Sequence, residues 1–124
     1  MKSLTPNLMV EDVNKTVEYY KKTLGFELVM TVPNEGVYNW AMMKRGNVEI
    51  MFQEKNNLIE EYPVLKDRTP GGGLTFFTKV GNAEALFEEL KDKVEIVLEL
   101  HKTFYGSYEF AIKDINGFVF TFAE

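Results

Sequence analysis

The residue types that most often perform chemistry in proteins are scarce in this chain. None of its 124 residues is a cysteine, which excludes disulfides, thiolate nucleophiles and cysteine-based zinc sites. His101 is the one histidine, so a metal motif built from two histidines of one chain is excluded too. Aromatic residues make up 14% of the chain, and they could serve a large core, a stacking pocket or both.

His101 itself has two interpretations. Imidazole titrates near neutrality, so the side chain could act as an acid or base. The favoured interpretation is a surface or edge residue, because a lone histidine without a partner is more often that, and His101 directly follows the predicted strand 94–100 near a turn at Tyr105-Gly106. No partner is identifiable in the sequence, and we therefore leave His101 outside the predicted catalytic residues.

The elements that would position functional side chains follow the same order twice. Alternating apolar residues predict strands, and apolar residues at helical spacing predict helices that begin after the N-cap residues Asp12 and Asn82. Strand, helix and three strands are expected at 3–10, 13–24, 26–32, 37–44 and 48–53 in the first half. The second half repeats this order at 74–80, 83–91, 94–100, 107–113 and 118–123.

A long connection separates the two halves. It holds a short amphipathic piece and ends in Pro70-Gly71-Gly72-Gly73. This glycine run lacks the Lys-Ser/Thr of a phosphate-binding P-loop, and no helix opens directly behind it, so we interpret it as a flexible joint. Around it the chain aligns with itself, because Val10-Glu11-Asp12-Val13 matches Val80-Gly81-Asn82-Ala83 and sets Thr5 against Thr75.

Two sets of motifs carry a family resemblance that spans essentially the whole chain. The first is Leu8-Met9-Val10-Glu11-Asp12-Val13, followed by Glu18-Tyr19-Tyr20 and Thr23-Leu24-Gly25-Phe26. The second is Tyr105-Gly106, followed by Phe110 to Phe118 with the turn Asp114-Ile115-Asn116-Gly117. With these motifs the chain resembles the glyoxalase/bleomycin-resistance/dioxygenase group of the vicinal-oxygen-chelate superfamily. Relatives usually have Asp-Pro-Asp-Gly at the turn, and the two substitutions here should preserve it.

The resemblance implies an α+β fold of two paired βαβββ modules that form a curved sheet around a central cavity. We expect a single domain over 1–124, with module one at about 3–53, the connection at 54–72 and module two at about 73–124. It also implies a homodimer; whether modules are exchanged between the chains of such a dimer stays open.

Four positions correspond to the metal-ligand positions of metal-dependent relatives. In this chain they are Thr5, Glu49, Thr75 and Thr121. Only Glu49 is a credible ligand, because neutral Thr hydroxyls are poor substitutes for imidazole or carboxylate. We therefore expect no bound metal and no cofactor. Glu49 remains as a candidate catalytic base or a binder of a cationic group, or else a strand residue with no chemical role.

The same resemblance and strand parity place further side chains toward the cavity. Tyr38, Trp40 and Met42 share one strand face and could form either a ligand-stacking wall or part of the core. The predicted ligand-binding residues are Thr5, Asn7, Trp40, Met51, Thr75, Phe77, Tyr105, Glu109 and Thr121. The opposite faces, which include Leu4, Leu8, Leu74, Phe76, Phe118, Phe120 and Phe122, are expected to pack under the helices.

The charge balance narrows the class of partner. A net charge of −5 argues against nucleic acid, and the N-terminus contains neither a signal peptide nor a membrane span, so we expect a cytoplasmic protein. We predict metal-independent binding of a small, cationic or aromatic molecule in a cleft, resembling bleomycin-resistance proteins. The alternatives are a lyase, isomerase or dioxygenase that uses Glu49 as base or ligand, and an interaction domain whose cavity is filled by its own aromatic residues. The sequence does not decide whether the chain is an enzyme, nor does it name the ligand.

Overall fold

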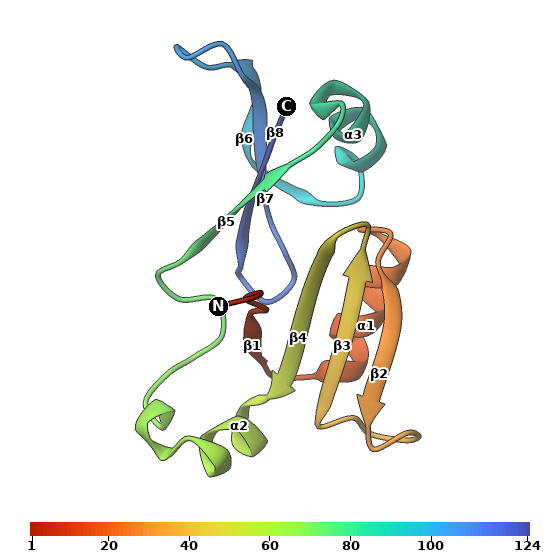
Figure 1. The fold of residues 1–124 in the computed structure, drawn as a ribbon, viewed down its shortest axis with the longest axis vertical. Coiled ribbons are helices and arrows are strands. Elements are labelled where there is room, and N and C mark those ends of the chain that lie inside the picture. Colours follow the sequence, from red (N-terminus) through yellow and green to blue (C-terminus); the bar gives the residue numbers. More distant parts are fainter. The chain divides into compact units, whose positions relative to one another are not determined.

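The computed structural model describes all residues, 1–124, as two compact units. The first unit is Met1–Pro70 and the second is Gly71–Glu124. Each contains a four-stranded mixed sheet, and neither sheet closes on itself (Figure 1). This is the α+β arrangement of two βαβββ modules that the sequence predicts. The predicted connection belongs almost entirely to the first unit.

The first unit has the strand order β1-β4-β3-β2. Its elements are β1 (Asn7–Val10), α1 (Val13–Lys22), β2 (Glu27–Val32), β3 (Trp40–Arg45), β4 (Val48–Glu54), α2 (Lys55–Glu61) and the 3₁₀ turn η1 (Pro63–Leu65). β1 runs parallel to β4, and the other neighbours are antiparallel. The parallel pair is possible because the chain between β1 and β4 runs through α1, β2 and β3, a connection long enough to bring β4 back in the same direction.

Helix α1 covers one face of the first sheet (Figure 1). Asp12 caps it as predicted, with Oδ1 accepting from the backbone N–H of Lys15 at 3.0 Å. Tyr20 packs from the helix onto Phe52 of β4, with 4.7 Å between ring centroids, and both are fully buried. The core of this unit therefore lies between α1 and one face of the sheet, which leaves the opposite face free of a helix over most of its length.

The second unit repeats this topology with the order β5-β8-β7-β6. Its elements are β5 (Thr75–Lys79), α3 (Ala83–Leu90), β6 (Glu95–Lys102), β7 (Tyr108–Lys113) and β8 (Val119–Ala123). Asn82 caps α3, and its Oδ1 accepts from the backbone N–H of Ala85 at 2.8 Å. Phe87 of α3 meets Phe110 of β7 edge to face at 5.3 Å, so aromatic rings build this core as well.

Several expected boundaries differ from the structure. The first strand begins at Asn7 rather than Ser3, because Pro6 has no N–H to offer a ladder. Leu4 precedes this strand and is 90% exposed, and Leu74 precedes the strand Thr75–Lys79 and is 44% exposed, so neither is the core residue that strand parity predicted. Tyr38 precedes β3 and is held by a loop contact, in which its backbone N–H donates to Asn14 at 2.8 Å. His101 lies inside β6 rather than after it.

Candidate ligand-binding site

The helix-free face of the first sheet gathers polar side chains at one end. Across the parallel ladder Asn7 pairs with Met51 and Met9 with Gln53. Across the antiparallel ladder Trp40 pairs with the same Gln53. Because side chains alternate along a strand, Asn7, Trp40 and Gln53 all project from this face.

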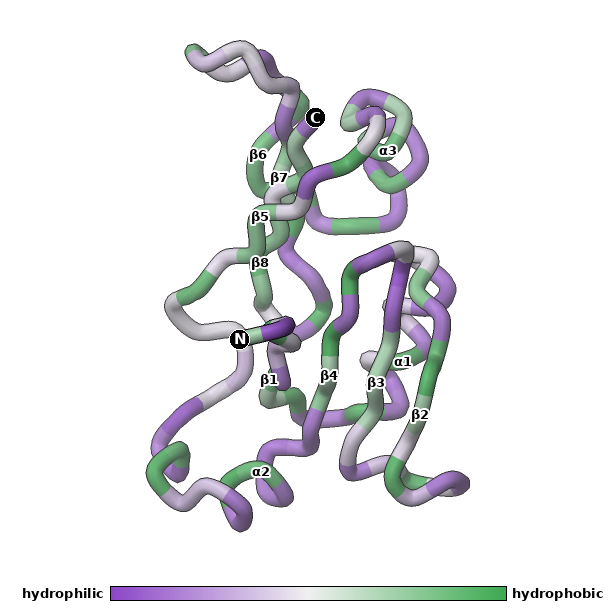
Figure 2. The backbone as a smooth tube through the Cα atoms, viewed as in Figure 1, coloured by the Kyte–Doolittle hydropathy of each residue, from purple (hydrophilic) through white to green (hydrophobic).

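Helix α2 returns over this end of the sheet. β4 passes into α2 without a loop, and Glu54 makes the turn possible because its carboxylate accepts from the backbone N–H groups of Asn56 and Asn57 at 2.8 and 3.0 Å. The helix contacts β1 and β4, and Figure 2 shows the segment around it as mostly hydrophilic. It therefore brings polar side chains toward a sheet that already carries them.

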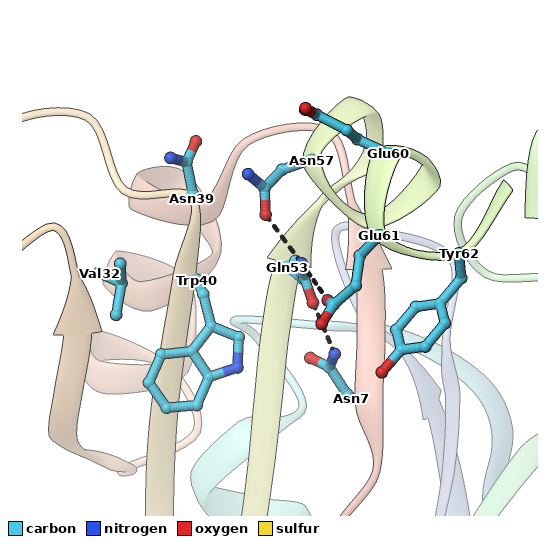
Figure 3. Close-up of a pocket in the computed structure, with 9 residues that line it drawn as sticks. All are labelled: Asn7, Val32, Asn39, Trp40, Gln53, Asn57, Glu60, Glu61 and Tyr62. Carbon is cyan, nitrogen blue, oxygen red and sulfur yellow. Dashed lines mark hydrogen bonds between the residues drawn. The ribbon is translucent and has the colours of Figure 1, made fainter.

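These elements line a pocket of about 570 Å³ that is open to solvent. Small-molecule sites typically have volumes of roughly 300–1,000 Å³. Figure 3 shows Trp40 on one side, Tyr62 on the other, and a row of polar side chains between them. The lining residues are Asn7, Val32, Asn39, Trp40, Gln53, Asn57, Glu60, Glu61 and Tyr62.

A chain of hydrogen bonds runs through the pocket floor. Asn7 Nδ2 donates to Gln53 Oε1 at 2.8 Å (Figure 3). Gln53 Nε2 in turn donates to Asn57 Oδ1 at 2.8 Å and to Glu61 Oε1 at 3.0 Å. Gln53 is only 6% exposed, so its amide is removed from water. These hydrogen bonds offset the free-energy cost of that desolvation. The floor is therefore ordered before any ligand arrives.

The charge of the pocket has one sign. Its two charged lining residues are Glu60 and Glu61, and no Lys or Arg lines it. Lys55 is the first residue of α2, and its Nζ lies 3.7 Å from the carboxylate of Glu11. The pocket consequently combines two carboxylates with two aromatic rings, which is the chemistry that attracts organic cations.

Only some of the predicted site residues of the first unit line this pocket. Asn7 and Trp40 line the pocket, whereas Thr5, Glu49 and Met51 do not. Thr5 lies just before β1, and Glu49 is exposed opposite Lys44 in the ladder. Met51 lies on the same face as Asn7 and is half-buried.

The strand registers also change which residue of the first unit corresponds to Thr121, one of the four positions equivalent to the metal ligands of relatives. Asn7 pairs with Met51 in the first sheet, and Phe77 pairs with Thr121 in the second. When Thr5 is aligned with Thr75, the position that corresponds to Thr121 is therefore Met51, two residues beyond Glu49. Moreover, no group of three or more His, Cys, Asp or Glu side chains is arranged to hold a metal ion.

The predicted residues of the second unit share the helix-free face of their own sheet. Phe77 is opposite Thr121, which is opposite Ala111, and Glu109 is two residues before Ala111 on β7. Thr75 and Phe77 are exposed, while Glu109 is only 6% exposed. The structure thus brings Thr75, Phe77, Glu109 and Thr121 to one face.

Tyr105 and Glu109 form a direct pair on that face. The Tyr105 hydroxyl donates to Glu109 Oε2 at 2.5 Å. This hydrogen bond, together with burial and the negative charge of the carboxylate, raises the pKa of Tyr105 above its usual value. His101 lies opposite Glu109 in the β6–β7 ladder, and its Nδ1 is 2.7 Å from the carbonyl oxygen of Glu99. A Nδ1–H tautomer would donate to that carbonyl and leave Nε2 as an acceptor.

Four residues central to the pocket were missed by sequence reasoning, namely Gln53, Asn57, Glu61 and Tyr62. Gln53 had a usable signal, since it is a polar residue two positions beyond Met51 and therefore on the same strand face. The other three lie on or just after α2. Their place in the site depends on the path of the chain after β4, which strand parity does not predict.

Comparison with known proteins identifies the family. A model of the Glyoxalase/Bleomycin resistance protein/Dioxygenase superfamily matches residues 3–122, and the chain belongs to this superfamily. Among curated protein sequences, none matches. None of the helices combines the length and apolar character needed to cross a membrane.

Solved structures share the fold at low sequence identity. TioX from Micromonospora sp. ML1 has a TM-score of 0.79 and 19% identity, covering 100% of this chain and 98% of its own. A superfamily member from Sphaerobacter thermophilus has a TM-score of 0.77 and 18% identity, with coverage of 100% and 98%. A bleomycin-binding protein from Streptomyces verticillus, complexed with copper(II)-bleomycin, has a TM-score of 0.66 and 23% identity, with coverage of 98% and 94%.

Proposed function

We propose that the first unit binds a small organic cation with an aromatic part, without a metal ion. The observation that carries this proposal is the pocket between Trp40 and Tyr62, whose charged lining residues are both carboxylates. A cation over an aromatic face gains about 0.5–2 kcal/mol, and more when water is excluded. The carboxylates of Glu60 and Glu61 are exposed and screened by water, so each adds about 0.2–1 kcal/mol of attraction for a cation.

The family supports the same kind of function. The Streptomyces verticillus neighbour is a bleomycin-binding protein, so this fold is used for small-molecule capture. At 23% identity the likeness concerns the fold, and the ligand of this chain must follow from its own pocket. That pocket is polar at its floor and aromatic at its sides, which favours a flat molecule with a charged nitrogen group.

The enzymatic alternative rests on Glu49. This side chain is exposed, is opposite Lys44 and is outside the pocket lining, so it lacks the buried setting that would suit a general base. We therefore expect purified protein to contain no stoichiometric zinc, nickel or iron, and Glu49→Gln to leave ligand binding unchanged. Stoichiometric metal that disappears in Glu49→Gln would instead favour the enzyme.

Self-association is part of the proposal. β2 is an edge strand of the first sheet and exposes Leu28, Val29 and Met30. Exposed apolar edge strands favour pairing with another chain. We expect a homodimer in light scattering, and a monomer across the micromolar range would contradict this part alone.

Binding can be measured directly because Trp40 is the single tryptophan. Benzamidine and phenyltrimethylammonium combine an aromatic ring with a positive charge, whereas benzoate is a similarly sized anion. We expect either cation to change tryptophan fluorescence saturably and to raise the melting temperature, because a ligand that binds the folded state stabilises it. Benzoate should do neither. Equal responses to cation and anion, or none to any of the three, would contradict the proposal.

A further inference from the structure

Asn7 Oδ1 is a buried oxygen without a hydrogen-bond partner in a pocket whose other floor groups are bonded. Buried polar atoms nearly always have a partner, so an exception in a binding pocket points to a partner that arrives from outside. The oxygen belongs to a side chain that lines the pocket, and its amide nitrogen is already held by Gln53. The oxygen itself has almost no exposed surface, so a ligand in the pocket must displace the side chains that cover it before it can donate to Oδ1.

The orientation of this oxygen is determined by Glu61. A carboxylate can only accept, so the group of Gln53 that faces Glu61 Oε1 must be its donor, Nε2. Gln53 Oε1 then faces Asn7 and requires a donor, which is Nδ2 of Asn7. Reversing either amide would place two acceptors or two donors against each other. Asn7 is therefore obliged to present Oδ1.

We propose that Asn7 Oδ1 accepts a hydrogen bond from the ligand, so that the pocket selects a protonated amine or amidinium over a cation without N–H groups. This inference rests on the proposed function and specifies its ligand class. The carboxylates and aromatic rings attract any organic cation, but only an N–H donor completes the hydrogen bonding of Asn7. Gln53 and Glu61 act as positioning residues, since they fix the amide that meets the ligand.

The two cations already named separate charge from hydrogen bonding. Benzamidine presents N–H donors on a flat group, whereas phenyltrimethylammonium carries a similar charge without any donor. We expect benzamidine to bind at least about tenfold more tightly in isothermal titration calorimetry, the factor that one hydrogen bond to a charged group contributes. Equal affinities for the two cations would overturn the inference while leaving the proposed function standing.

Substitution of the acceptor tests the assignment to Asn7. Asn7→Leu keeps the approximate size of the side chain and should weaken benzamidine binding about tenfold or more, while phenyltrimethylammonium changes by less than about threefold. Asn56→Leu, on an exposed position of α2 outside the pocket lining, is the matched control and should change neither affinity. An equal loss for both cations in Asn7→Leu would assign the side chain a merely structural role and contradict the inference.

Unaltered protein provides a second measurement in case Asn7→Leu does not fold. Hydrogen bonding to an amide oxygen shifts the ¹³C resonance of its carbonyl carbon, so saturating benzamidine should move the Asn7 Cγ resonance and phenyltrimethylammonium should leave it nearly unmoved. If benzamidine binds without moving this resonance, Asn7 is not the acceptor. If neither cation binds, the proposed function fails and this inference fails with it.

Discussion

At the scale of single residues, Gln53 shows how one amide can organise a site. It bridges Asn7 on one strand to Asn57 and Glu61 on the following helix. The carboxylate of Glu61 can only accept, which fixes the orientation of the Gln53 amide. The Gln53 amide in turn fixes the orientation of the Asn7 amide, although Glu61 and Asn7 are not bonded to each other. A polar residue buried in a strand is therefore informative when its partners are identified.

Tyr105 gives a prediction at the same scale. Its hydrogen bond to Glu109 stabilises the neutral phenol, so its pKa is raised and the associated stability is present below pH ~10 and is lost as the pH rises through the folded-state pKa. We expect an alkaline titration followed by phenolate absorbance to show a late-ionising tyrosine that Tyr105→Phe removes. In Glu109→Gln this tyrosine should ionise at a lower pH, because the carboxylate is gone. If the titration that disappears in Tyr105→Phe occurs at or below the ordinary tyrosine pKa, the pairing is contradicted. It is also contradicted if Glu109→Gln leaves the pKa of this tyrosine unchanged.

At the scale of elements, the direct passage from β4 into α2 creates the pocket. The strand delivers Gln53 to the helix-free face, and the helix that follows returns with three of the lining residues. Glu54 is both the last residue of the strand and the cap of the helix. Because the Glu54 carboxylate caps α2, and α2 carries lining residues, this carboxylate helps to hold those residues in place in the pocket.

Removing this cap should affect binding as well as stability. We expect Glu54→Ala to lower the free energy of unfolding by about 1 kcal/mol, because two backbone N–H groups lose their acceptor. Benzamidine affinity should fall with it, since α2 carries Asn57 and Glu61. Chemical denaturation followed by Trp40 fluorescence, and calorimetry of binding, measure the two effects.

Two variants serve as controls for the cap. Glu54→Asp keeps a carboxylate that can cap the helix and should retain binding. Asn82→Ala removes the equivalent cap from α3 in the second unit and should cost a similar free energy, seen by circular dichroism, without changing benzamidine affinity. If Asn82→Ala weakened binding as much as Glu54→Ala, the effect would be general destabilisation rather than disorder of α2.

At the scale of the whole molecule, the two units share one topology but expose different chemistry. The helix-free face of the first sheet carries a polar, acidic pocket, and that of the second carries Thr75, Phe77 and Thr121 with a buried Glu109. The two units therefore share the order of strands in their sheets, while the side chains on the two helix-free faces differ. The main polar feature of the first unit's face is the pocket, and that of the second unit's face is the Tyr105–Glu109 hydrogen bond.

The first residue of the second unit gives a prediction for the joint. Gly71 has φ +87°, and a Cβ there would lie 2.7 Å from the carbonyl oxygen of Asn116. We expect Gly71→Ala to destabilise the protein by more than about 1 kcal/mol, because it strains the backbone and displaces the Asp114–Gly117 turn. Gly72→Ala, which has open space and no positive φ, should be neutral or slightly stabilising. Equal melting temperatures for the two variants would contradict this account of the joint.

The fold was predictable because its signals are local. Strand alternation, the caps Asp12 and Asn82, and the Asp114–Gly117 turn each act over a few residues, and each is observed. One error lies where a single residue interrupts a pattern, as Pro6 does by removing an N–H from the first strand, and the others concern where strands begin and end. Asn7 and Trp40 were predicted as ligand-binding residues, and both line the pocket.

The sequence by itself determined the class of fold, the repeat, and the scarcity of metal-ligating side chains, since these follow from residue type and spacing. Only the tertiary structure decided that the polar end of the first sheet is covered by α2, that Glu61 orients Gln53, and that Asn7 Oδ1 is left unpaired. The physical reason is that hydrogen-bond direction is a property of the assembled network. Glu61 is 54 positions from Asn7 in the sequence, and their coupling exists only because the chain folds back across its own sheet.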